Sequence, residues 1–295
     1  MDRTFCSDVS TQSGEPLLGS ATHCGELVLV SWPKGDWESD ALDTPGLPHA
    51  LPHWRSERVA AGTRSVVRLV SRPGTSAESL VAMGWPGGWR AEGMRPQNLV
   101  ASMEAAMEAL LAGSDDVAVQ RPVIVVCAHG NHDACCALYG TRFAQRVRKA
   151  VARLGADVDV WESTHLGGHR FSATAITLPW GHMHGRLGPD DADALVEHAV
   201  AGAPWLARFR GNVFLDEARQ VAEGAALAWA AENGLSGRAF VGPAREDDTV
   251  HVTVGGRQIV IRLERREFET LKSCDEAPLG RLVARRLVVA SIDDE

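Results

Sequence analysis

Two hydrophobic runs in the middle of the chain each lead into metal-binding residue types, and this order constrains the fold more than any other feature. The run Pro122–Val126 leads directly into Cys127, and the run Asp157–Trp161 leads towards His165. Short apolar runs of this kind are typical of buried strands. The carboxyl ends of neighbouring strands form one edge of an open α/β sheet, where sites usually lie. The sequence therefore predicts that both groups meet at one edge of a sheet.

The spacings Cys127-x8-Cys136 and His165-x3-His169 supply two thiolates and two imidazoles. This is a full ligand set for a zinc ion or an iron–sulfur cluster, and residue types alone do not separate the two. Glycines at 167 and 168 make a continuous helix through both histidines unfavourable. Three alternatives stay open: Cys135 as the second thiolate, buried structural cysteines, and histidines that only make loop hydrogen bonds.

Around these residues the pattern predicts the order strand, helix, strand, then a hairpin and a helix. The predicted segments are Val123–Val126, Ala137–Leu154, Val158–Glu162, the hairpin Ser172–Leu178 with His182–Arg186, and the helix Asp190–Ala201. Acidic residues at the start of the last helix suit its amino-terminal dipole. This order is that of a thioredoxin-like fold.

The flanking regions have a different character. Before the centre we expect strands at Glu26–Ser31, Ser65–Val70 and Ser79–Met83, a loop at Leu47–Pro52 and an amphipathic helix at Asn98–Ala112. After it we expect a helix at Asp216–Asn233 and strands at Arg238–Val241, Thr249–Val254 and Gln258–Leu263, the last two joined by a Gly255-Gly256 hairpin. The prediction is an α/β protein with an N-terminal α/β region (1–115), a thioredoxin-like domain carrying the metal site (116–205), and a helix plus small β-rich module (206–295).

Composition limits the partners of the protein. Its 295 residues carry a formal net charge of −8, which disfavours nucleic acid or anionic membranes as partners. No apolar run approaches the roughly 20 residues of a membrane span, and no signal peptide is evident, so we expect a cytoplasmic protein. Six cysteines in such a chain favour metal or redox chemistry over a disulfide scaffold.

Several segments together resemble one family. They are Cys127–Ala137, Val160–Phe171 with its His-Leu-Gly-Gly-His-Arg-Phe run, Leu178–Gly181, and near the start Cys6-Ser7 and Gly14–Gly19. These segments resemble the sucrase/ferredoxin-like family of thioredoxin-like ferredoxins, over about residues 1 to 200. The resemblance implies a [2Fe–2S] cluster held by Cys127, Cys136, His165 and His169, as in the bis-histidinyl, non-Rieske branch. It implies an electron carrier with a redox partner protein rather than a turnover enzyme, and no sucrase activity.

Imidazole in place of thiolate on one iron removes negative charge, so the reduction potential should exceed that of an all-cysteine ferredoxin. A ligating imidazole keeps a second ring nitrogen that can titrate, which predicts a potential that falls as pH rises. His129, His132, His182 and His184 are candidates for lining the site, or else ordinary loop and hairpin residues. Arg170 is expected to offset cluster charge, to dock an acidic partner, or to be an ordinary surface residue.

Two other functions compete with this interpretation. One is a structural zinc site in a partner-binding module. The other is a thiol-dependent oxidoreductase with Cys127 as nucleophile, although the chain has no C-x-x-C motif. The remaining cysteines, Cys6, Cys24 and Cys274, are scattered along the chain. Cys6 and Cys24 either pair, bind a second centre, or are two further buried thiols.

Overall fold

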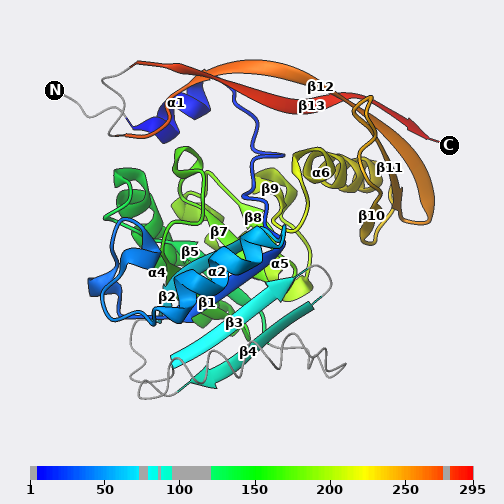
Figure 1. Cartoon of the computed structure of the whole chain (residues 1–295). Coiled ribbons are helices and arrows are strands. Elements are labelled where there is room, and N and C mark those ends of the chain that lie inside the picture. Colours follow the sequence, from blue (N-terminus) through cyan, green and yellow to red (C-terminus); the bar gives the residue numbers. More distant parts are fainter. Residues whose placement is uncertain (1–4, 73–78, 86–87, 95–120, 275–279, 295) are drawn as a thin grey trace.

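The computed structural model describes residues 5–72, 79–85, 88–94, 121–274 and 280–294. Its strands form two sheets, a nine-stranded mixed sheet and a four-stranded antiparallel sheet (Figure 1). The strands of the large sheet are β1 (Glu26–Ser31), β2 (Ser65–Ser71), β3 (Ser79–Trp85), β4 (Gly88–Met94), β5 (Val123–Cys127), β6 (Asp159–Ser163), β7 (Ala175–Leu178), β8 (His182–His184) and β9 (Phe209–Asn212). The small sheet contains β10 (Ala239–Val241), β11 (Thr249–Val254), β12 (Arg257–Thr270) and β13 (Leu282–Asp294).

Helices cover both sheets. The α-helices are α1 (Cys6–Gln12), α2 (Ala50–Ala60), α4 (Thr141–Leu154), α5 (Ala192–Ala201) and α6 (Glu217–Glu232). A π-helical turn, η4 (Cys136–Gly140), precedes α4. Short 3-10 turns are η1 (Lys34–Asp36), η2 (Ala41–Asp43), η5 (His169–Phe171), η6 (Pro189–Asp191) and η7 (Leu206–Arg208).

The centre of the large sheet has the predicted thioredoxin-like arrangement. Its strand order there is β6-β5-β7-β8, with β5 parallel to β6 and antiparallel to β7, and with α4 and α5 in the predicted places along the chain. Strand β9 extends this sheet at one edge, and β2, β1, β3 and β4 extend it at the other. The α/β class and the thioredoxin-like domain are confirmed, while the proposed division at 115 and 205 stays a prediction.

Apolar spacing explains which faces are buried. In α4 the buried positions Phe143, Ala144, Val147 and Ala150 recur at helical spacing. They pack on every second side chain of β5, namely Ile124 and Val126. The alternate side chains of β5, Val123, Val125 and Cys127, belong to a second core on the opposite face of the sheet. This alternation places the Cys127 sulfur on the face opposite α4.

Local signals fix the ends of the helices. The carboxylate of Asp216 accepts a hydrogen bond from Arg219 N–H (3.0 Å) and caps α6, as acidic N-caps do. Gly155 and Gly202 end α4 and α5 in the left-handed conformation.

Two predictions about the N-terminal region are not confirmed. The predicted loop Leu47–Pro52 is wrong at its end, because α2 begins at Ala50. Pro52 lies in the first turn of this helix, where the missing N–H has no intrahelical acceptor in any case. The predicted helix Asn98–Ala112 lies outside the described residues.

The C-terminal module is larger than predicted. The Gly255-Gly256 turn joins β11 to β12 as expected, but β12 runs to Thr270 and pairs along its length with β13. Helix α6 packs on one face of this sheet through small alanine side chains. The β12–β13 ribbon then extends across the molecule, and its far end lies beside α1 (Figure 1).

Candidate metal centre

The two predicted ligand groups meet at one end of neighbouring parallel strands. Cys127 is the last residue of β5 and is paired in register with Ser163, the last residue of β6. His165 follows two residues later. The predicted convergence at one sheet edge is therefore confirmed, and it comes directly from the parallel pairing of β5 with β6.

The second cysteine comes back to Cys127 through the turn η4. Helix α4 is preceded by this π-helical turn, which starts at Cys136 and ends at Gly140. A Cβ on Gly140 would lie 1.8 Å from the Cys127 carbonyl oxygen, so only glycine permits this close approach of helix and strand. Such π-helical turns recur at functional sites.

Three of the four predicted ligands form a compact group. One metal-ligating atom from each of Cys127, Cys136 and His165 lies within 4.8 Å of the others. The Cys136 sulfur is 3.6 Å from His165 Nδ1. The Cys136 thiol and then His165 bond to the Cys127 sulfur, which holds the pKa of Cys127 well below its usual range, while sharing that proton raises the pKa of Cys136. These contacts favour the thiolate form of Cys127, which is the form that binds metals.

Two further histidines, His129 and His132, lie beside His165 of this group. The rings of His132 and His165 stack at 3.9 Å between centroids, and His129 Nδ1 accepts a hydrogen bond from His165 N–H (3.1 Å). Burial lowers the pKa of His165 to about 4 and also lowers the pKa of His129. A neutral imidazole has a lone pair for a metal, so burial favours the ligating form of His165.

His169 lies next to the group but faces a different neighbour. Its ring centroid is 5.3 Å from that of His165. Its Nδ1 is 3.0 Å from a carboxylate oxygen of Asp133 and 3.4 Å from the Cys6 sulfur. His169 is therefore adjacent to the other three predicted ligands, with its Nε2 not engaged in these two contacts.

A second group of thiols lies beyond His169. The sulfurs of Cys6, Cys135 and Cys274 are 3.1–3.6 Å apart, and the Asp133 carboxylate joins them. Cys135, which the sequence left open as a rival ligand, thus belongs to this group. The Cys274 and Cys6 thiols bond to the Cys135 sulfur and lower its pKa to about 4, whereas the pKa of Cys274 rises to about 11.

Little in the spacing of the cysteines indicates this second group. Cys6 and Cys24 are both free thiols and lie in different cores, Cys6 with Cys135 and Cys274, and Cys24 with Cys127. The one local signal was the Cys135-Cys136 doublet, whose neighbouring side chains serve the two groups separately.

Buried arginine and glycine residues support the histidine loop. Gly167 and Gly168 both have positive φ, as the loop requires. The fully buried Arg210 of β9 donates to the Gly167 carbonyl (3.0 Å) and to the Ser20 hydroxyl (3.0 Å). A Cβ on Gly168 would lie 2.4 Å from Arg210 Nη2. Sequence reasoning missed Arg210, which is remote along the chain.

Arg170 has a structural partner that the sequence did not predict. It forms a two-pronged ion pair with the fully buried Glu15 (2.9 Å), and Arg286 of β13 bonds to the same carboxylate (2.9 Å). The partner-docking and free-surface interpretations of Arg170 are therefore wrong. Glu15 connects the histidine loop to the β12–β13 ribbon.

Of the other four histidines considered in the sequence, two line the site and two do not. His129 and His132 line the site, as described above. His182 and His184 are buried in β8, where His184 Nε2 accepts a hydrogen bond from Trp205 N–H (3.1 Å), and neither belongs to either metal-ligating group. Their interpretation as hairpin residues is the correct one.

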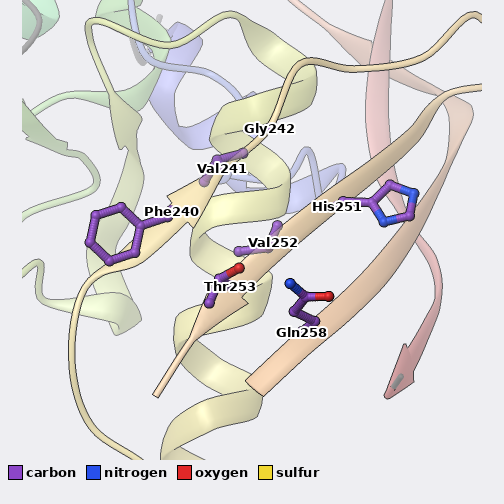
Figure 2. A pocket seen from close by; sticks show the side chains of 7 residues that line it. All are labelled: Phe240, Val241, Gly242, His251, Val252, Thr253 and Gln258. Carbon is purple, nitrogen blue, oxygen red and sulfur yellow. The ribbon is translucent and has the colours of Figure 1, made fainter. Parts of the chain in front are cut away.

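A separate pocket lies on the C-terminal sheet, on the face turned away from α6 (Figure 2). Its lining residues are Phe240, Val241, Gly242, His251, Val252, Thr253 and Gln258. Phe240 is 72% exposed. This set contains none of the cysteines, so the pocket is distinct from the metal-ligating groups.

The chain is similar in sequence to known proteins. The sequence matches the family described as sucrase/ferredoxin-like over residues 17–219. A curated relative, "Altered inheritance of mitochondria protein 32" of Debaryomyces hansenii, is 27% identical over 101 residues, which are 32% of this chain and 37% of that protein. The chain thus matches only about a third of the length of this relative.

Solved structures with similarity include two of a thioredoxin-like [2Fe–2S] ferredoxin from Aquifex aeolicus. Both are 16% identical, with TM-scores of 0.28 and 0.27, and both cover 31% of this chain and 91% and 97% of the ferredoxin. Among the described residues, no helix is long and apolar enough to cross a membrane.

Proposed function

Since the chain belongs to the sucrase/ferredoxin-like family, we propose that it is an electron-transfer protein that binds a [2Fe–2S] cluster through Cys127, Cys136, His165 and His169. The observation that carries the proposal is the meeting of two buried thiols and two imidazoles at the ends of β5 and β6. Two thiolates and two imidazoles are a known ligand set of two-iron clusters. When bound, such a cluster accepts and returns one electron.

The separation of His169 from the compact group supports two metal positions over one. A single ion needs all its ligand atoms within one small sphere, and only Cys127, Cys136 and His165 satisfy that condition. A two-iron centre takes two protein ligands at each metal, so its four ligand atoms need not lie within one such sphere. His169, with its ring 5.3 Å from that of His165, could therefore serve as a ligand although it lies outside the compact group.

The nitrogens of the two histidines have distinct surroundings. His165 faces the thiols with Nδ1, 3.6 Å from the Cys136 sulfur. In His169 the contact of Nδ1 with Asp133 leaves Nε2 for a metal. A carboxylate on the other nitrogen of a ligating histidine orients the ring and raises its basicity. Asp133 is thus a positioning residue for His169.

The environment also suits an inorganic cluster. The buried His129 packs beside His165 and accepts the His165 N–H at Nδ1, which leaves its Nε2 protonated in the neutral ring. Cys127 and Cys136 are almost fully buried, whereas His132, His165 and His169 reach partial exposure. We expect a redox partner protein to approach on this histidine side, where the path for an electron is shortest.

One alternative has direct support from the geometry. The group of Cys127, Cys136 and His165 is small enough for a single zinc ion. A nucleophilic Cys127 is less compatible with the structure, because its side chain is fully buried and a reactive thiol needs access to its substrate.

The test is a visible absorption spectrum of the full chain purified without oxygen, with iron, sulfide and zinc assayed on the same sample. We expect a coloured protein with about two irons and two sulfides per chain. Cys136→Ser and His165→Ala should lose the colour and the iron. Cys24→Ser and His53→Ala serve as controls, since Cys24 is a buried cysteine outside both groups and the His53 side chain is exposed.

A colourless protein holding one zinc that both Cys136→Ser and His165→Ala remove would overturn the proposal in favour of the zinc site. Iron retained at the wild-type level in those two variants would show that the ligands lie elsewhere.

A further inference from the structure

The second thiol group has the composition and geometry of another metal site. Its three cysteines come from α1, from the turn before η4 and from the segment after β12, so the fold brings together residues up to 268 positions apart. The sulfur–sulfur distances are 3.6 Å for Cys6–Cys135, 3.1 Å for Cys135–Cys274 and 3.5 Å for Cys274–Cys6. All three are free thiols and all are buried.

These distances fit a zinc ion with little rearrangement. Two thiolates on one tetrahedral zinc, each about 2.3 Å from the metal, lie about 3.8 Å apart. The centre of the observed triangle is about 2.0 Å from each sulfur, so an ion slightly above its plane reaches all three at bonding distance. Soft thiolate donors select zinc over the hard cations magnesium and calcium.

Asp133 supplies a fourth donor. One oxygen of Asp133 lies within 4.8 Å of the three sulfurs, as they do of one another. Its carboxylate accepts hydrogen bonds from the N–H groups of Cys135 (2.8 Å) and Cys274 (3.1 Å), which hold it beside the thiols. Zinc accepts carboxylate oxygen at about 2.0–2.2 Å. Four protein donors close the coordination shell, which is typical of structural zinc sites.

Further donors face the sulfurs themselves. The N–H of Cys6 points to the Cys274 sulfur at 3.5 Å, and the hydroxyl of Ser7 lies 3.4 Å from the Cys135 sulfur. Hydrogen bonds of this kind stabilise the negative charge of a metal-bound thiolate. Polar groups directed at two of the three sulfurs are not a feature of an ordinary apolar core.

We propose that Cys6, Cys135, Cys274 and Asp133 bind a structural zinc ion, separate from the proposed cluster. The ion ties α1 and the far end of the β12–β13 ribbon to the loop that follows β5. It also adjoins the cluster ligands, because Cys135 precedes Cys136 in the chain and Asp133 contacts His169. The zinc site rests on its own residues and does not require that the other site hold iron.

The experiment is a metal assay on the full chain purified under reducing, oxygen-free conditions with zinc in the growth medium. We expect about one zinc per chain in the wild type. Cys274→Ala and Cys6→Ala should lose that zinc while keeping iron, sulfide and visible absorption. The matched control is Cys24→Ala, which removes a buried thiol outside both groups and should keep the zinc.

The two proposals fail in different ways. Loss of iron without loss of zinc in Cys136→Ser bears only on the cluster. Zinc content unchanged by Cys274→Ala, or a wild type that takes up no zinc, overturns the zinc site. A wild type that holds no zinc and has a mass lower by two hydrogens, when Cys274→Ala shows no such loss of hydrogens, also overturns the zinc site. That result would indicate a disulfide between Cys135 and Cys274.

Folding defects in the variants do not block the test. Cobalt substituted for zinc in the wild-type protein gives thiolate-to-metal charge-transfer bands and the visible bands of a tetrahedral ion. We expect both after correction for the cluster spectrum. Cobalt that binds with neither set of bands contradicts the assignment.

Discussion

Replacing Glu15 by glutamine should destabilise the fold strongly. Glu15 is fully buried and accepts hydrogen bonds from Ser10 (2.8 Å), Arg170 (2.9 Å) and Arg286 (2.9 Å). The variant leaves two guanidinium groups, each 18% exposed, without a counter-charge. Removing one partner of a buried ion pair typically costs about 3–5 kcal/mol. In a chain of this size such a cost lowers the melting temperature by about 6 °C or more.

The pH dependence gives this prediction a second readout. Burial alone would raise the pKa of Glu15, but the hydrogen bonds and charge of Arg170 outweigh it, so the pKa is lowered from 4.5 in the folded state. The stabilisation by Glu15 is therefore full above about pH 4.5 and is lost as the pH falls through the folded pKa. The difference in the free energy of unfolding between the wild type and Glu15→Gln should therefore become smaller in acid.

Urea denaturation at pH 7 and at pH 3.5 measures both effects. The matched control is Glu57→Gln, which alters a carboxylate that is 65% exposed and paired with His53, and should change stability by less than about 0.5 kcal/mol. If Glu15→Gln is no less stable than Glu57→Gln at pH 7, the reasoning about the buried ion pair is refuted.

Three further predictions concern Glu223, Gly168 and the histidines of the proposed cluster site. Burial raises the pKa of Glu223 to about 7, so the free energy of unfolding falls as the pH rises from about 4.5 to 7. In urea denaturation, Glu223→Gln should be more stable than the wild type by up to about 3 kcal/mol at pH 8 and equally stable near pH 4. Gly168→Ala should lose the visible absorption, since its Cβ meets Arg210, whereas Gly130→Ala, with ordinary contact at 3.6 Å, should keep it. The reduction potential should fall with rising pH by up to about 59 mV per unit, and a potential constant from about pH 6 to 9, by voltammetry, refutes proton coupling through the histidines.

The β12–β13 ribbon shows why part of the fold could not be predicted. Its strands carry many charged residues, and sequence reasoning ended the third strand at Leu263 and missed the fourth. In the structure these charges pair across the strands, as in Arg285–Glu267 (2.9 Å) and Arg281–Glu269 (3.1 Å). Strand propensity depends on cross-strand neighbours, which a single segment of sequence does not reveal.

The sequence by itself determined the centre of the protein. Val123–Val126 before Cys127 and Val158–Trp161 before His165 are apolar enough to form buried strands wherever they lie, and parallel pairing then brings their ends together. Nearby residues also determine where the helices begin and end, because Asp216 caps its own helix and because Gly155 and Gly202 adopt the left-handed conformation that ends α4 and α5. These features depend on neighbours within a few residues.

Only the tertiary structure decided which side chains share a site. Cys6 meets Cys274 across 268 positions, and Cys135 and Cys136, adjacent in the chain, join different groups because successive side chains point in different directions. Arg210 and Glu15 support the histidine loop from β9 and from the segment after α1. Burial, charge pairing and metal ligation act between atoms a few ångströms apart, and the folded chain, not the spacing along it, fixes those distances.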